Sequence, residues 1–246
     1  MKKFLVLLSI LFSSFTYADT INLHWRNYDG TTYQNSTCVI DGDLIIPATT
    51  PTRYGYTFTG WKLGNYIPIE YLESTGTQYI DTGFTPTTQT KVYIKYLIKN
   101  FNSSSGYIAI YGSKDTGNKG IFVNWAEHWY VNNVYQQINL PVETNVNYED
   151  TLYGTTWVHN AISYTVSPVA ANSLNIFLFA RNANNTPERI GSLQIFICKI
   201  YDNNTLVRDF IPVLDENNVP CMFDMVEGKF YYNAGTGQFI AGPLLQ

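Results

Sequence analysis

The stretch TKVYIKYLIK, residues 90–99, shows how this chain folds. Apolar side chains at positions 92, 94, 96 and 98 alternate with positions 93, 95, 97 and 99, two of which are lysines. A period of two is typical of a β-strand that buries one face. No segment of the chain keeps the 3.6-residue period of an amphipathic helix, and turn residues recur between short apolar runs. The pattern predicts an all-β protein.

The most apolar segments are suited to the centre of a sandwich. They are LNIFLFAR, residues 174–181, and GSLQIFICKIY, residues 191–201. Aromatic residues make up 16% of the chain and charged residues only 14%. Aromatic and β-branched side chains fill pleated strands, while Asn, Gly and Thr fill turns. This composition is typical of a secreted all-β protein and not of a disordered one.

Two segments far apart in the chain resemble a known family. YLESTGTQYIDTG, residues 71–83, and GKFYYNAGTGQFIAGP, residues 228–243, resemble the first and last strands of concanavalin A-like (laminin G-like) jelly-roll modules of bacterial surface and phage-encoded proteins. The resemblance implies an antiparallel two-sheet jelly-roll sandwich over residues 65–246. It also implies recognition of a surface, often a glycan, rather than catalysis.

A second resemblance lies before this domain. PTRYGYTFTGW, residues 51–61, resembles the end of the internalin-type B-repeat, a small β-grasp-like module. Residues 19–64 are therefore expected to form one such module, joined to the larger domain without a long linker.

The first 18 residues have the pattern of a secretory signal peptide. Lys2 and Lys3 precede a short apolar run, residues 4–12, and Ala18 supplies a small residue for cleavage. The run is too short to span a bilayer, and a buried first strand or helix is the alternative. We expect a secreted, periplasmic or cell-surface protein with no membrane insertion after cleavage.

The net charge excludes two classes of binding partner, and the cysteine count limits the possible disulfide bonds. A net charge of −4 argues against nucleic acid and anionic lipid, which bind clustered Lys and Arg. Of the three cysteines, Cys38, Cys198 and Cys221, only two can pair with each other. A bridge between Cys198 and Cys221 is conceivable, and a buried free thiol at Cys198 is the alternative.

The acidic residues do not form the pattern of a glycosidase. Such enzymes on a jelly-roll scaffold need two carboxylates on one strand face, and the families that resemble this fold carry a Glu-x-Asp-x-Glu run that is missing here. Glu149 and Asp150 are adjacent, so they point to opposite faces. The three histidines have no partner at zinc-ligand spacing. We therefore expect no enzyme.

A cofactor is not indicated, with one exception. Asp202, Asn203 and Asn204 form an oxygen-rich turn of the kind that can bind calcium, which makes Asp202 and Asn204 weak calcium candidates. Asx-rich hairpin turns are the commoner explanation for such a sequence.

Aromatic and amide side chains form the candidate binding site. Sugar rings stack on exposed Trp and Tyr, and Asn side chains both donate to and accept from hydroxyls. The alternative is that the rings fill the core. The candidate residues fall in two segments expected to lie on one sheet: Trp125, Trp129, Tyr130 and Asn132 in the first, Tyr153 and Trp157 in the second.

Three functions compete. The leading hypothesis is a secreted, non-catalytic recognition or adhesion protein that binds carbohydrate or another cell-surface ligand through its jelly-roll domain. The alternative is a structural protein that decorates an envelope, fibre or virion and binds other protein subunits. The third is a cryptic glycan-active enzyme.

Overall fold

A computed structural model describes residues 2–11, 20–26, 32–39, 47–52, 54, 56–63, 66–101, 107–117, 120–126, 128–132 and 137–245. These residues form strands and turns, and none of them lies in a helix. In this part of the chain there is accordingly no helix long and apolar enough to cross a membrane.

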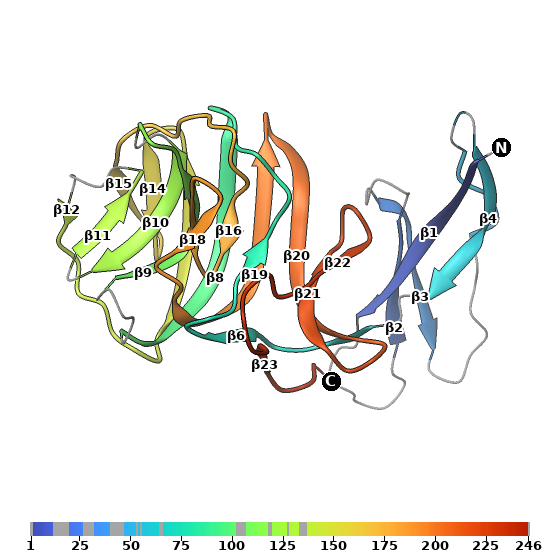
Figure 1. Cartoon of the computed structure of the whole chain (residues 1–246). Helices are drawn as coiled ribbons and strands as arrows, with labels where there is room; N and C mark the ends of the chain where they lie inside the picture. Colours follow the sequence, from blue (N-terminus) through green and yellow to red (C-terminus); the bar gives the residue numbers. More distant parts are fainter. Residues whose placement is uncertain are drawn as a thin grey trace.

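Two mainly antiparallel sheets contain the strands from Tyr66 onward (Figure 1). The larger sheet has the order β15-β14-β13-β8-β19-β20-β21-β22, with β5, β6 and β23 attached to it. Its strands are β5 (Tyr66–Pro68), β6 (Leu72–Thr75), β8 (Thr90–Asn100), β13 (Asn147–Tyr153), β14 (Thr156–His159), β15 (Ile162–Thr165), β19 (Ser192–Asp202), β20 (Thr205–Asp215), β21 (Pro220–Asp224), β22 (Lys229–Tyr231) and β23 (Ile240–Ala241).

The smaller sheet has the order β12-β11-β10-β9-β16-β7, with β17 joined to β9 and β18 to β17. Its strands are β7 (Ile80–Asp81), β9 (Ile108–Lys114), β10 (Gly120–Ala126), β11 (His128–Val131), β12 (Gln137–Ile138), β16 (Phe177–Leu178), β17 (Arg181–Ala183) and β18 (Thr186–Glu188).

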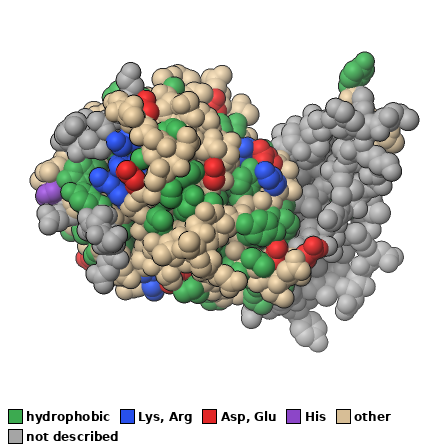
Figure 2. Space-filling view, in the orientation of Figure 1, with side chains coloured by type: hydrophobic (Ala, Val, Ile, Leu, Met, Phe, Trp, Pro, Cys, Tyr) green, Lys and Arg blue, Asp and Glu red, His purple; other side chains and the backbone are tan. Residues whose placement is uncertain are grey.

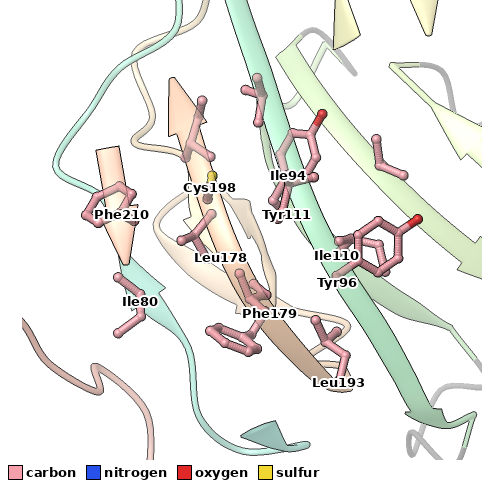
Figure 3. Close-up of a cluster of buried hydrophobic side chains, with 14 of the residues drawn as sticks. Ile80, Ile94, Tyr96, Ile110, Tyr111, Leu178, Phe179, Leu193, Cys198 and Phe210 are labelled. Carbon is pink, nitrogen blue, oxygen red and sulfur yellow. The ribbon is translucent and has the colours of Figure 1, made fainter. Parts of the chain in front are cut away.

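The core lies between these two sheets. Inward side chains of the larger sheet, such as Ile94 and Tyr96, share one buried cluster with Ile110 and Tyr111 of the smaller sheet (Figure 3). Burying one large apolar side chain stabilises the fold by about 1.5–3 kcal/mol, so this cluster dominates the stability. The alternation predicted for residues 90–99 is confirmed, because positions 92, 94, 96 and 98 are all fully buried. The predicted all-β antiparallel sandwich is confirmed with it.

The two segments that carry the family resemblance meet in space. Strand β23 pairs with β6, so Ile240 lies beside Glu73. The amide of Thr236 donates to the carbonyl of Thr77 at 3.1 Å. A Cβ at Gly235 would lie 2.1 Å from that same Thr77 carbonyl oxygen, closer than any side chain can approach. The glycine is therefore what allows the end of the chain to close against the first strands of the sandwich.

The buried cysteines do not pair. Cys198 and Cys221 are both free, and strand β20 separates their strands. Cys198 lies opposite Phe210 and Cys221 lies opposite Val213, three residues further along β20. The two thiols also pack in different apolar clusters, so a bridge is out of geometric reach. Burial raises the pKa of the Cys221 thiol to about 12 and that of Cys198 further, so neither thiol is reactive at neutral pH.

The first strands form a separate four-stranded sheet of order β3-β2-β1-β4, with β1 (Lys2–Leu11), β2 (Thr20–Arg26), β3 (Thr32–Val39) and β4 (Tyr56–Leu63). Strand β1 lies within the expected signal peptide, and it pairs with both β2 and β4. In the structure this segment is therefore a β-strand, which was the alternative to a signal peptide. Cleavage after Ala18 stays a prediction, and it would remove the strand between β2 and β4.

Replacing Gly235 by Ala should lower the free energy of unfolding by roughly 1–3 kcal/mol, because the new methyl group forces the backbone of Thr77 to move. Urea unfolding followed by tryptophan fluorescence measures this. Gly154→Asn is the control: its backbone has φ 52, nothing lies near its Cβ, and Asn tolerates this conformation. Equal stability of Gly235→Ala and the unchanged protein would contradict the close approach.

Candidate functional site

Two of the six candidate binding residues lie in the core. Trp129 and Trp157 are both 0% exposed, and their rings lie 5.4 Å apart. Trp129 is on the inward face of β11 and Trp157 on the inward face of β14, so they contact each other across the interior. The prediction that these rings stack on a ligand at the surface is wrong. Glu127, which lies between Trp125 and Trp129 in the sequence, is outside the described residues.

The other candidates do not come together as one surface either. Asn132 is buried, and its amide is used internally: it accepts from the Phe122 amide at 3.0 Å and donates to the Ser167 carbonyl at 3.0 Å. Tyr130 is buried against Phe122. Trp125 is half-buried and packs on Phe101, with 3.9 Å between ring centres.

Tyr153 is the one of the six that is exposed, at 47%. It lies on the outward face of β13, the side of the larger sheet away from the core.

A buried carboxylate organises the interior beneath this strand. Asp150 is 0% exposed, and its side chain accepts hydrogen bonds from Tyr96 Oη at 3.1 Å and from Trp157 Nε1 at 3.0 Å. Its second oxygen lies 2.6 Å from His159 Nδ1. These partners belong to β8 and β14, the two strands that flank β13. One carboxylate therefore ties three adjacent strands together at the same level.

Burial raises the pKa of Asp150, and the hydrogen bonds from His159, Trp157 and Tyr96 offset part of that rise. Aromatic rings enclose the group: Trp129 lies 5.1 Å from the His159 ring, and Tyr148 stacks on His159 at 5.2 Å. With the acid fully enclosed and the histidine nearly so, this pair holds the strands together. It is a structural polar core.

A groove lies on the opposite, outward side of the same strands. It has a volume of about 550 Å³, within the usual range for ligand sites. Lys95 and Glu149 form an ion pair in it, with 3.0 Å between Nζ and Oε2. Hydrogen bonding to Glu149 and Tyr93 raises the pKa of Lys95, so this amine stays charged. The lining residues are Glu70, Lys95, Asn147, Tyr148, Glu149, Thr151, Val158, Asn160, Ala161 and Phe196.

Strand parity places these groups. Along β13, Asn147, Glu149 and Thr151 face outward, and the residues between them are buried. The turn after β14 closes one end of the groove, because Asn160 accepts a hydrogen bond from the Glu149 amide at 2.9 Å. Tyr153 continues the outward row by two residues. The sequence NYEDTLY shows the same alternation. It therefore predicts an outward row of polar side chains on this strand, and the emphasis on aromatic rings missed that row.

The weak calcium candidates form a hairpin turn. Asn203 and Asn204 have φ of 46° and 63°, the left-handed pair that a two-residue hairpin between β19 and β20 requires. Asp202 accepts hydrogen bonds from Thr87 Oγ1 and Thr90 Oγ1. Across the described residues, no group of three or more His, Cys, Asp or Glu could hold a metal ion. The hairpin accounts for the oxygen-rich sequence, and calcium binding stays a prediction.

Comparison with known proteins adds no family to this picture. A scan against protein-family models and a search of curated proteins both find no match. The resemblances to the concanavalin A-like module and to the B-repeat therefore stay predictions, and function rests on the geometry of the groove.

Replacing Asp150 by Leu should strongly destabilise the protein, because Tyr96, Trp157 and His159 lose their acceptor. An unsatisfied buried group costs about 1–3 kcal/mol, so we expect a loss of at least about 3 kcal/mol in urea unfolding. Asp150→Asn keeps one acceptor oxygen and should lose less. The exposed neighbour gives the control, since Glu149→Gln should change stability by less than about 0.5 kcal/mol. If the Asp150→Leu variant is as stable as the unchanged protein, Asp150 does not hold the three strands together.

The raised pKa of Asp150 predicts a pH dependence with a definite sign. Between the ordinary value for aspartate and the raised one, the folded state binds more protons than the unfolded state. The contribution of Asp150 to the free energy of unfolding therefore falls as pH rises above about 4. Measured against Asp150→Asn, the unchanged protein should lose stability from pH 4 to 7. A relative gain would show instead that a charged pair with His159 is favoured.

Proposed function

We propose that the protein is a non-catalytic recognition protein that binds a glycan in the groove on the outward face of the larger sheet. The observation that carries the proposal is the lining of the groove. Polar groups of all kinds line it: the amides of Asn147 and Asn160, the Thr151 hydroxyl, and the charged pair Lys95 and Glu149. Phe196 and Val158 add apolar surface.

This mixture matches the chemistry of a sugar. Each sugar hydroxyl both donates and accepts, and amide side chains can satisfy both needs. Carboxylate and ammonium groups form charge-assisted hydrogen bonds, which are stronger than those between neutral groups. The C–H faces of a sugar ring can pack on Phe196 and on the exposed ring of Tyr153 along the same strand face.

The groove is built on rigid elements. Lys95 projects from β8, Phe196 from β19, and the polar row from β13, all strands of one continuous sheet. The strands are held in register by Asp150 on the other face, directly beneath the groove. Such preorganisation lowers the entropic cost of binding.

The placement of the acids supports binding over hydrolysis. Asp150 is enclosed in the core, whereas its neighbour Glu149 is held by Lys95 in the groove. Glu70 is the other acid that lines the groove, and a glycosidase needs two carboxyl groups free to act on one bond, whereas Glu149 is paired with Lys95. A secreted location, as the expected signal peptide implies, would bring the groove to polysaccharides outside the cell.

Glycan-array binding of the full chain, followed by titration of the best ligand, tests the proposal. Asn147→Ala and Thr151→Val should each weaken binding about tenfold, which corresponds to the loss of one hydrogen bond worth about 1.4 kcal/mol. Thr186→Val is the matched control on β18 of the smaller sheet and should bind unchanged. The proposal fails if no glycan binds, or if the groove variants bind as tightly as the control.

A further inference from the structure

The outer face of the smaller sheet contains two buried polar side chains with unsatisfied hydrogen-bonding atoms. Asn124 on β10 is 0% exposed, and within the described part of the chain neither its amide nitrogen nor its amide oxygen has a hydrogen-bond partner. Arg181 on β17 is 2% exposed; its Nη2 donates to Glu188 at 2.7 Å, but Nε and Nη1 find no acceptor among the described residues. A buried donor or acceptor left unpaired is costly, so each one calls for an explanation.

These two side chains lie on the same outer surface. The Arg181 guanidinium lies 5.2 Å from the centre of the Phe122 ring, and Asn124 follows Phe122 by two residues on β10. Gly112 is opposite Phe122 on the intervening strand, where an added Cβ would lie 2.3 Å from the Phe122 Cβ. The lack of a side chain at Gly112 is what allows the guanidinium of β17 to reach the ring on β10.

More positive charge surrounds them. Arg189 lies beside β9, where its carbonyl accepts from the Ala109 amide at 2.7 Å, and Ala109 is the register partner of Asn124. Burial and the charge of Arg181 lower the pKa of both Lys114 and Arg189. Basic side chains gather with an acidic one over β10 in the space-filling view (Figure 2). The arginine cluster, defined as Asn124, Arg181, Arg189 and Lys114, is therefore an electropositive and partly desolvated surface.

We propose that the arginine cluster binds an acidic sugar, with the carboxylate of the sugar on Arg181 and its hydroxyls on Asn124. The anion supplies acceptors to Nε and Nη1 and relieves the repulsion among three cations. A bare anion offers only acceptors, which would leave the Asn124 amide oxygen without a donor. The ligand must therefore carry a hydroxyl or amide next to its charge, and this requirement selects an acidic sugar over an inorganic anion.

The exposed ring of Tyr107 lies on the solvent side of the cluster. The Arg189 guanidinium lies 4.3 Å over the ring of Tyr107, which is itself exposed, and the Tyr107 ring lies 6.4 Å from that of Tyr130. Rotation of the Arg189 and Tyr107 side chains admits the ligand to Arg181. The C–H face of a sugar can then pack on the Tyr107 ring. This site is on the opposite sheet from the groove and does not depend on it.

Stability of the free protein gives the first test. Asn124→Leu removes an unsatisfied amide and should raise the melting temperature by a few degrees, although it replaces a buried residue. Asn182→Leu is the matched control: Asn182 is buried on β17, but its amide donates to Asn175 and accepts from Asn185, so its loss should lower the melting temperature. If Asn124→Leu destabilises as much as the control, a buried water or another hidden partner satisfies the amide, and the proposal is overturned.

Binding gives the second test. The full chain is titrated with tetragalacturonate, with its methyl ester as the neutral match, and with sodium sulfate as the bare anion. We expect tetragalacturonate to bind at least tenfold more tightly than either, and Asn124→Leu and Arg181→Lys to lose that preference. Lys229→Gln, which removes an exposed positive charge from β22 outside both sites, should keep it. If the acid and the ester bind equally tightly, the carboxylate is not recognised and the proposal is wrong. If sulfate binds as tightly as tetragalacturonate, the cluster is an inorganic anion site and the proposal is also wrong.

Discussion

The carboxylate of Asp150, fully enclosed between the two sheets, is the interaction on which the rest of the structure depends. A buried charge or acid is costly unless its oxygens are satisfied, and here Tyr96, Trp157 and His159 satisfy them. The three partners come from the strands on either side of β13. A slip of one residue in either strand would turn Asp150 or its partners to the wrong face, so the network selects a single register.

The same network shapes the contact between the sheets. Trp129, from the smaller sheet, packs among the rings of Tyr96, Tyr148, Trp157 and His159 of the larger sheet. Three of those four rings are oriented by their bonds to Asp150. These rings occupy the interior, and we therefore propose the outward faces for contacts with a ligand: the groove on the larger sheet and the arginine cluster on the smaller one.

The periodicity of the strands was enough to predict the fold, but it was not enough to predict the candidate site. The alternation in residues 90–99 states which side chains share a face, and one apolar face implies a core. For the segment with Trp125 and Trp129 the same alternation states that the two rings share a face, but not whether a second sheet covers it. That depends on packing between strands distant in the sequence. The prediction that Trp129 and Trp157 face solvent was therefore wrong, because both rings face the core.

The sequence gives less information about the buried polar network and about the arginine cluster. Asp150 sits at an inward position of NYEDTLY between Tyr148 and Leu152, and an acid at such a position indicates a buried polar network. The partner His159 could not have been assigned, because its position opposite Asp150 follows from the β13–β14 hairpin register. The exposed row on β13 is the complement of that inward row. Arg181 and Asn124 come to the same sheet face because β17 and β10 both pair with β9, and no local sequence pattern predicts that pairing.

We propose that the aromatic interior is structural and that ligands bind outside it, and nuclear magnetic resonance of the tryptophan indoles tests this most directly. The indole N–H of Trp157, bonded to Asp150 and enclosed by rings, should exchange with solvent only on the timescale of global unfolding. It should also keep its chemical shift when a glycan binds, while the amides of residues 147–151 shift. Rapid exchange of that indole, or a large shift on binding, would show that the aromatic interior is itself the ligand site and would contradict the account.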